Sequence, residues 1–340
     1  MTAPSLATRQ PVWPALSWGL VGLACLLASL VIGLTVGAYD LLWHHWSEGG
    51  AEVFWHIRLP RVLMGLLAGA ALGVAGALVQ GVFRNPLADP GLIGVTGGAA
   101  LGAWLAILLG AEVGLGWAGP WGLIVPAFVG GLVVTVLSWR LASRQGQLSV
   151  SLLLLMGVAI NALAGSGLGL LSYLSTDQQL RALTFWLLGS LSGSQWPTVI
   201  PCAGVVALAL ARPLLVPAHA RALNALALGE GQARLMGVDV RATQVWSIAA
   251  VALSVGAVTA LCGMVGFVGL LAPHLIRLVR GPDHRWVLPG SAVVGGCLVV
   301  LADGAARTWV APAELPLGVL TGLLGAPVFV WMLWRRLPAA

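Results

Sequence analysis

The chain has 340 residues, of which 59% are hydrophobic and only 8% are charged. An ordinary soluble chain is about 25% charged, and surface-to-volume scaling leaves too little interior to hide this much apolar surface from water. The composition therefore excludes a soluble enzyme, a disordered protein and a secreted disulfide scaffold. The long, continuous apolar runs also exclude a porin-type barrel, whose strands alternate apolar and polar residues. A mean hydropathy of +0.96 predicts a chain that uses lipid as its solvent.

Runs of apolar residues divide the sequence into candidate membrane spans. A helix needs about 20 predominantly apolar residues to cross a bilayer. We expect an all-α membrane protein with about ten transmembrane helices, forming a single domain over residues 1–340. In chain order the predicted spans are 15–38, 62–82, 92–110, 119–139, 148–174, 196–212, 243–265, 267–279, 286–306 and 316–334.

Three stretches between these spans are not expected to cross the membrane. Residues 39–61 are predicted to be an external loop rich in Trp and His. Residues 175–195 begin with too many polar side chains to span, which predicts a short external helix. Residues 213–242 form the longest cytoplasmic segment and carry charges among Leu and Ala at helical spacing, which predicts one or two amphipathic helices beneath the membrane.

The arginines indicate the orientation of the chain. With the N-terminus placed in the cytoplasm, 13 of the 17 arginines fall in inside segments. The four that fall outside are Arg58, Arg61, Arg181 and Arg307. Positive residues concentrate on the cytoplasmic side of membrane proteins, so both termini are predicted to be cytoplasmic.

All 17 basic residues are arginine, and this limits the chemistry of the chain. A P-loop needs a lysine that reaches the β- and γ-phosphates, so this chain is not expected to be an enzyme or to hold a nucleotide. We expect no catalytic residue, no metal site and no cofactor on this chain. If it does energised work, ATP and Mg²⁺ are bound by a partner ATPase.

Small and polar residues within the spans carry two further predictions. Gly65, Gly69 and Gly73 recur every four residues, which places a smooth stripe on one helix face and favours close packing of its backbone against a neighbour. No carboxylate is expected at mid-membrane, since Asp303 lies toward the outer end of its span. Ion-coupled carriers usually keep ionisable residues along their pathway, so this pattern disfavours a secondary transporter.

Four long segments of the sequence resemble the permease subunits of type II ABC importers, the family that imports iron–siderophores, heme and vitamin B12. They are RLPRVLMGLLAGAALGVAGALVQGVFRNPLADPGLIGVTGGAALG (58–102), LNALALGEGQARLMGV (223–238), GFVGLLAPHLIRLVRGPDHRWVLPG (266–290) and ELPLGVLTGLLGAPVFVWML (314–333). They follow the family order over nearly the whole chain. The resemblance implies ten helices per subunit, in agreement with the hydropathy.

The resemblance also implies the partners and the location of the chain. Two copies are expected to pair around one central pathway in the bacterial inner membrane, in contact with lipid. Two ATPase subunits are expected beneath them, and a periplasmic substrate-binding protein above. No nucleic-acid partner is expected.

Three sets of site residues follow from the resemblance. Arg58, Arg61 and Arg307 match arginines that contact acidic residues on the binding protein, although snorkelling at helix ends is the plain alternative. The second set matches the coupling helices that fit a groove on the ATPase, although its Glu and Arg, four residues apart, could simply form a helix pair. It consists of Gly229, Glu230, Arg234 and Gly237, and we call residues 213–242 the coupling segment. The third set, the cytoplasmic gate, consists of Asn85, Ser149 and Ser151.

The sequence AELP at 313–316 looks more like that of heme and cobalamin permeases than that of catecholate-siderophore permeases. We therefore expect a permease that moves heme from periplasm to cytoplasm by alternating access. Cobalamin and ferric siderophores are alternative cargoes. Two hypotheses of other classes are an ion-coupled secondary carrier and a structural or signalling subunit of a membrane complex.

Overall fold

Long helices make up most of the structure, a computed structural model that describes residues 15–37, 50–110, 119–144 and 147–334. The strands in this part of the chain are β1 (Ser143–Arg144) and β2 (Gln147–Leu148), which pair antiparallel as a short hairpin. The helices are α1 (Ala15–Thr35), α2 (Gly50–Glu52), the π-helix η2 (Val53–Arg58), α3 (Leu59–Phe83), the 3-10 helix η3 (Pro90–Ile93), α4 (Val95–Leu109), α5 (Trp121–Ala142), α6 (Val150–Tyr173), α7 (Asp177–Leu188), α8 (Trp196–Leu215), α9 (Pro217–Ala227), α10 (Glu230–Leu235), α11 (Val240–Cys262), α12 (Val268–Arg280), α13 (His284–Thr308) and α14 (Leu317–Trp334).

The all-α fold class predicted from the sequence is confirmed, and each of the ten predicted ranges contains a helix. Among the described residues, seven helices are long and apolar enough to cross a membrane, and α4 and α14 contribute shorter apolar segments. The eighth range corresponds to α12, which has 13 residues and is therefore only about 20 Å long. This helix is too short to cross a hydrocarbon core of about 30 Å by itself.

The predicted external loop over residues 39–61 is wrong for its second half. From Gly50 onward the chain is already helical, and it runs without a break into α3 as one 34-residue segment. Pro60 does not end the helix, because the π-helical turn before it pairs Leu59 N with Phe54 O and Pro60 lies in the first turn of α3. The first part of the predicted loop lies outside the described residues.

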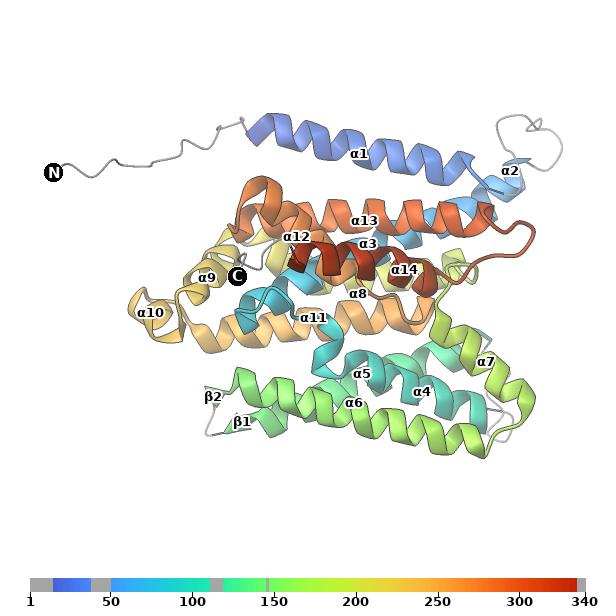
Figure 1. The fold of residues 1–340 in the computed structure, drawn as a ribbon, viewed down its shortest axis with the longest axis horizontal. Helices are drawn as coiled ribbons and strands as arrows, with labels where there is room; N and C mark the ends of the chain where they lie inside the picture. Colours follow the sequence, from blue (N-terminus) through green and yellow to red (C-terminus); the bar gives the residue numbers. More distant parts are fainter. Residues whose placement is uncertain (1–14, 38–49, 111–118, 145–146, 335–340) are drawn as a thin grey trace.

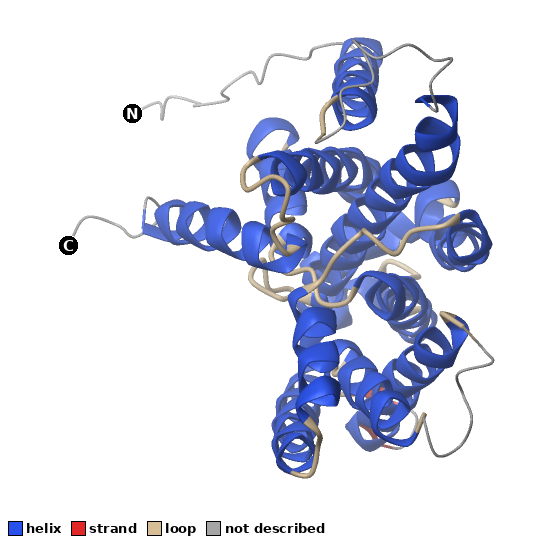
Figure 2. Ribbon diagram, turned by 90° about the vertical axis from the view of Figure 1, so that its right-hand side faces the viewer, coloured by secondary structure: helices blue, strands red, loops and turns tan. Residues whose placement is uncertain are grey.

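The long helices lie side by side in two groups (Figures 1 and 2). One group contains α3, α8, α11, α12 and α13, with α1 along its edge and α14 projecting to one side. The other contains α4, α5, α6 and α7, and it joins the first group through contacts of α11 with α4 and α5. At one end of the molecule lie α9, α10 and the hairpin, and at the opposite end lie α2 and α7 (Figure 1).

Glycines bring the backbones of neighbouring helices into direct contact, as the glycine stripe predicts. A Cβ added at Gly69 of α3 would collide with the carbonyl oxygen of Gly295 on α13, and one added at Gly98 of α4 would collide with that of Gly130 on α5. These close approaches place α3 inside the protein, with 78% of its span buried, whereas only 11% of the α1 span is buried. The central helix therefore meets its neighbour backbone to backbone, whereas the peripheral helix meets side chains, such as that of Val300 against Gly33.

Candidate functional site

Three arginines, one aspartate and one glutamate meet at the α2/α7 end, and we call them the arginine cluster: Arg58, Arg61, Asp303, Arg307 and Glu314. Arg58 is the last residue of η2 and Arg61 lies in the first turn of α3. Asp303 and Arg307 come from the last turns of α13, and Glu314 from the loop before α14. The three arginines predicted for docking, Arg58, Arg61 and Arg307, are only 4%, 8% and 7% exposed in the single chain. The structure thus brings together all three residues predicted for docking, but as a buried group.

Arg61 lies at the centre of this cluster and bonds to both acids. Its Nε and Nη2 donate to the carboxylate of Asp303 at 2.9–3.1 Å, and its Nη1 and Nη2 donate to the two oxygens of Glu314 at 2.8 and 2.9 Å. Bidentate contacts of this kind are the strongest that a guanidinium makes with carboxylates. Asp303 is 3% exposed at its side chain, whereas Glu314 is 40% exposed, so Glu314 is the open edge of the cluster.

Arg58 and Arg307 hold the end of α1. Arg58 Nη1 donates to the carbonyl oxygens of Leu34 and Thr35 at 2.7 Å, and Arg307 Nη2 donates to that of Gly33 at 3.0 Å. The last carbonyls of a helix lack internal partners and carry partial negative charge, so cations stabilise them. Arg307 also pairs with Asp303 at 3.0 Å, one helical turn earlier.

Glu314, the more exposed acid of the cluster, is kept ionised by its arginine partner. The hydrogen bonds from Arg61 hold the pKa of Glu314 below its usual range, although partial burial opposes the shift. Two carboxylates and three guanidiniums leave one net positive charge, and backbone carbonyls of α1 accept hydrogen bonds from Arg58 and Arg307. The arrangement ties α1, α3, α13 and the loop before α14 together at one point.

The coupling segment, at the opposite end, folds into α9 and α10 as predicted, and its charges face water. Arg234 pairs with Glu230 at 3.6 Å across one turn of α10, with side-chain exposures of 53% and 30%. Gly229 and Gly237 flank this helix with φ of +108° and +78°, conformations that L side chains rarely adopt. Glycine is therefore required at both turns that set α10 against its neighbours.

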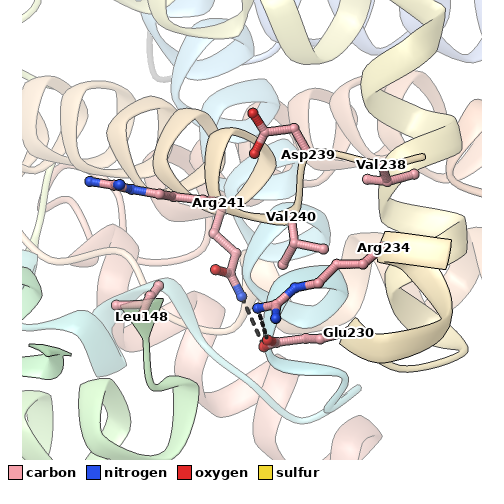
Figure 3. A pocket seen from close by; sticks show the side chains of 8 residues that line it. Leu148, Glu230, Arg234, Val238, Asp239, Val240 and Arg241 are labelled. Atoms are coloured by element: carbon pink, nitrogen blue, oxygen red, sulfur yellow. Dashed lines mark hydrogen bonds and ion pairs between the residues drawn. The ribbon is translucent and has the colours of Figure 1, made fainter. Parts of the chain in front are cut away.

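A cavity of about 230 Å³ lies between α10, the start of α11 and the hairpin. Figure 3 shows Glu230 and Arg234 pointing toward one another at its edge, with Leu148 of β2 across from them. Gln244 of α11 donates to Glu230 at 3.1 Å, which ties the short helix to the long one. Glu230 and Arg234 thus form the i, i+4 pair that their spacing predicts. They also line one side of the cavity, and residues of α11 and β2 line the rest.

α9 packs beneath the bundle through a buried histidine. His219 is 3% exposed, and its Nε2 lies 3.1 Å from the hydroxyl of Ser247 on α11. Burial, with a smaller effect of Arg212, lowers the pKa of His219 to about 4. The imidazole is therefore neutral at physiological pH and links the coupling segment to α11.

The predicted gate residues lie at the same end of the molecule as the coupling segment. Within the described residues, no hydrogen bond joins Asn85 to Ser149 or Ser151. Asn85 is exposed, and its Oδ1 accepts from Leu87 N at 2.9 Å in the turn after α3. Ser149 caps α6 by accepting from Leu152 N at 3.3 Å, and Ser151 is exposed on the first turn of that helix. Both predicted positions are helix ends at which the backbone changes direction.

A family model describing the FecCD transport family matches residues 21–335. The chain belongs to the FecCD transport family. As a FecCD permease it is a membrane subunit of an ABC importer, in which a separate ATPase hydrolyses ATP. The sequence motifs predicted a permease of this family, and the match to the family model confirms that prediction.

Two curated relatives span almost the same length as this FecCD chain. The hemin transport system permease protein HmuU of Yersinia pestis is 43% identical over 340 residues, covering 96% of this chain and 97% of the relative. The vitamin B12 import system permease protein BtuC of Escherichia coli (strain UMN026) is 41% identical over 329 residues, covering 96% and 98%. Cargo therefore differs between relatives that are almost equally similar to this chain.

A solved structure is similar to the fold as a whole. It is described as an inward-facing conformation of a metal-chelate type ABC transporter, and it matches with a TM-score of 0.82 at 31% identity, over 95% of this chain and 100% of that one. The type II ABC permease bundle predicted from the motifs is thereby confirmed.

Sequence reasoning found the arginines of the cluster but missed their partners. Asp303 and Arg307 are spaced by four on a helix, which is a signal for an ion pair. Glu314 lies in the AELP sequence and opens the last family motif, but nothing local pairs it with Arg61. No spacing rule connects Arg61 with Asp303, 242 positions away, because that contact depends on how α3 packs on α13.

Proposed function

We propose that this FecCD permease carries heme from the periplasm to the cytoplasm. The observation that supports heme is the 43% identity to the hemin permease over almost the full length of both chains. The AELP sequence at 313–316 favours heme and cobalamin equally. Cobalamin is the second candidate, because the vitamin B12 permease is 41% identical, and ferric siderophores are the third.

Uptake into proteoliposomes tests the cargo. The permease is reconstituted with its ATPase, and labelled heme or labelled cobalamin is supplied on the matching binding protein. We expect ATP-dependent accumulation of heme and none of cobalamin. Accumulation of cobalamin alone would contradict the heme proposal, and uptake that continues without ATP but stops with an ionophore would indicate a secondary carrier.

The assembly that we propose contains two copies of this chain, two ATPase subunits and one binding protein, in the inner membrane with both termini cytoplasmic. The α9/α10 end then faces the cytoplasm, which agrees with the excess of arginine in the segments predicted to lie inside. The exposed apolar side chains of α6 and α14, such as Leu155, Leu163 and Val330, are available for the second copy or for lipid.

The binding protein is proposed to dock over the arginine cluster, with Arg61 as the reachable cation. Every guanidinium nitrogen of Arg61 already donates to an acid of the chain, so an acidic residue of the binding protein competes with Glu314, the 40% exposed partner. Arg58 and Arg307 lie behind and steer by charge while they hold α1. Glu314→Gln should therefore strengthen docking by about tenfold, close to one charge-pair energy, as measured by surface plasmon resonance at low salt.

The ATPase is proposed to seat on the coupling segment, at Gly229, Glu230, Arg234 and Gly237. The exposed charges of α10 and the adjoining cavity give a partner both polar contacts and a recess. ATP-driven approach of the two ATPase subunits then moves α9 and α10 as a rigid unit, the kind of two-state element that alternating access needs. Asn85, Ser149 and Ser151 are proposed to form the gate that this motion opens and closes.

A further inference from the structure

The side chain of Asn224, on α9, forms the hydrogen bonds that connect the coupling segment with α13. Its Oδ1 accepts from the backbone N of His284 at 2.9 Å and lies 2.8 Å from His284 Nδ1. Its Nδ2 donates to Asp283 Oδ1 at 2.7 Å. The carboxylate fixes which end of the amide is nitrogen, so Asn224 Oδ1 is the acceptor that holds the hydrogen on His284 Nδ1.

The two partners of Asn224 are fixed firmly at the start of α13. Asp283 is the N-cap of α13, and it also accepts from Arg285 N at 2.9 Å and Arg285 Nε at 2.8 Å. The hydrogen bond from the Arg285 side chain is the main cause that lowers the pKa of Asp283 to about 2, so the carboxylate remains an acceptor at any physiological pH. The side chain of Asn224 is thus bonded to a helix cap, Asp283, that stays ionised at physiological pH.

The ring of His284 extends this junction to α3. His284 is 5% exposed, and a Cβ added at Gly81, near the end of α3, would lie 2.8 Å from its Nε2 and 3.3 Å from Leu223 on α9. Three helices therefore meet around one imidazole: α9, α13 and α3. When α9 moves, it pulls on the imidazole of His284, because Asn224 is hydrogen-bonded to its Nδ1.

α13 leads from this junction to the arginine cluster. It runs for 25 residues from His284 to Thr308, a length of about 37 Å, and it contacts α3 along the way through Gly69 and Gly295. Asp303, near its far end, bonds to Arg61 of α3. The same pair of helices is therefore bonded to the coupling segment at one end and to the proposed docking site at the other (Figure 1).

From this geometry we infer that Asn224 is the positioning residue that transmits motion of the coupling segment to the α3–α13 pair, and so links ATPase stimulation to docking. The inference rests on the proposed seat of the ATPase. Asn224 acts through Asp283 and His284, and it touches neither nucleotide nor cargo. A second link from α9, the bond between His219 and Ser247, leads to α11 instead and gives a matched control.

The test uses the complete transporter in proteoliposomes, with ATP hydrolysis measured with and without cargo-loaded binding protein. In Asn224→Ala we expect stimulation by the binding protein to fall about fivefold or more, which is the range of one allosteric coupling energy, while unstimulated hydrolysis stays within about twofold. Ser247→Ala removes the hydrogen bond between His219 of α9 and α11, together with the bond from Ser247 to Thr243 O, and should keep its stimulation. Full stimulation in Asn224→Ala, or equal loss in Ser247→Ala, would overturn the inference.

An exchange of side chains separates positioning from folding. Asn224→Asp alone places two carboxylates together and should lose stimulation. Asn224→Asp combined with Asp283→Asn restores a donor opposite an acceptor between the two side chains, although it gives up the cap bond from Arg285 N, and we expect it to regain part of the stimulation. A double variant that stays as impaired as the single one would contradict the inference. A wild-type complex without stimulation or uptake would instead contradict the proposed function itself.

Discussion

The two charged regions at opposite ends of the chain differ in how their charges are satisfied. In the arginine cluster, Arg61 is 9% exposed at its side chain and bonds to two acids at 2.8–3.1 Å. In the coupling segment, Arg234 is 53% exposed and its one ion pair measures 3.6 Å. Charge buried among membrane helices has to be neutralised within the chain, whereas charge at an aqueous end stays available to a partner. Burial therefore indicates which region serves mainly the fold.

The largest expected effect comes from removing the acid that two arginines share. Asp303→Asn leaves Arg61 and Arg307 buried with Glu314 as their remaining carboxylate, and breaking a buried pair costs about 3–5 kcal/mol. We expect a large drop in the midpoint of thermal unfolding in detergent. Asp177→Asn, on the exposed first turn of α7, is the control and should unfold like the wild type. Equal midpoints for both variants would show that the cluster does not stabilise the fold.

Acid should weaken the junction of α9 with α11 by up to about 3 kcal/mol. The folded-state pKa of His219 is about 4, below the ordinary 6.5, so the unfolded chain binds more protons between these values. Stability is complete above pH 6.5 and is lost as the pH falls toward 4. His219→Gln keeps a hydrogen-bonding group without the titration, so its unfolding midpoint should fall less steeply over this window. Identical slopes would contradict a buried, neutral histidine.

Separating the two helices that join both regions should have an intermediate effect. Gly69→Ala forces a methyl group against the carbonyl oxygen of Gly295, and such overpacking costs about 1–3 kcal/mol. Gly165→Ala, on α6, has nothing within 4 Å and should be silent. Thermal unfolding of the two variants measures the difference. A tolerated Gly69→Ala would mean that α3 and α13 can move apart freely.

The smallest effect on stability, with the clearest effect on transport, is expected at α10. Glu230→Arg removes a largely solvent-facing ion pair worth under about 1 kcal/mol and one hydrogen bond from Gln244, so the unfolding midpoint should fall only slightly. The reversal places a cation on the proposed ATPase seat, and ATP hydrolysis should continue without uptake. Coupled hydrolysis and uptake in this variant would remove Glu230 from the coupling surface. The contrast with Asp303→Asn separates a structural charge from a functional one.

Patterns local in sequence predicted much of the fold. The apolar runs located α3, α11 and α13 to within a few residues, and the polar spacing in the coupling segment predicted α9 and α10. The boundary that failed is the start of the helical segment that contains α3. This segment begins at Gly50, inside the predicted external loop, because a π-helical turn joins α2 to α3 without a break. Such a turn depends on a few backbone bonds that no hydropathy window detects.

The sequence by itself determined that this chain lives in lipid, that it lacks the lysine of a P-loop, and that it has the motifs of an importer permease. These properties depend on total composition or on short runs of residues, so they can be read without knowing how the chain folds. Only the tertiary structure decided that Arg61 is satisfied by Asp303 and Glu314, and that Asn224 bonds to the start of α13. Those pairs are 59 to 253 positions apart, and the packing of whole helices, not any local pattern, brings them together.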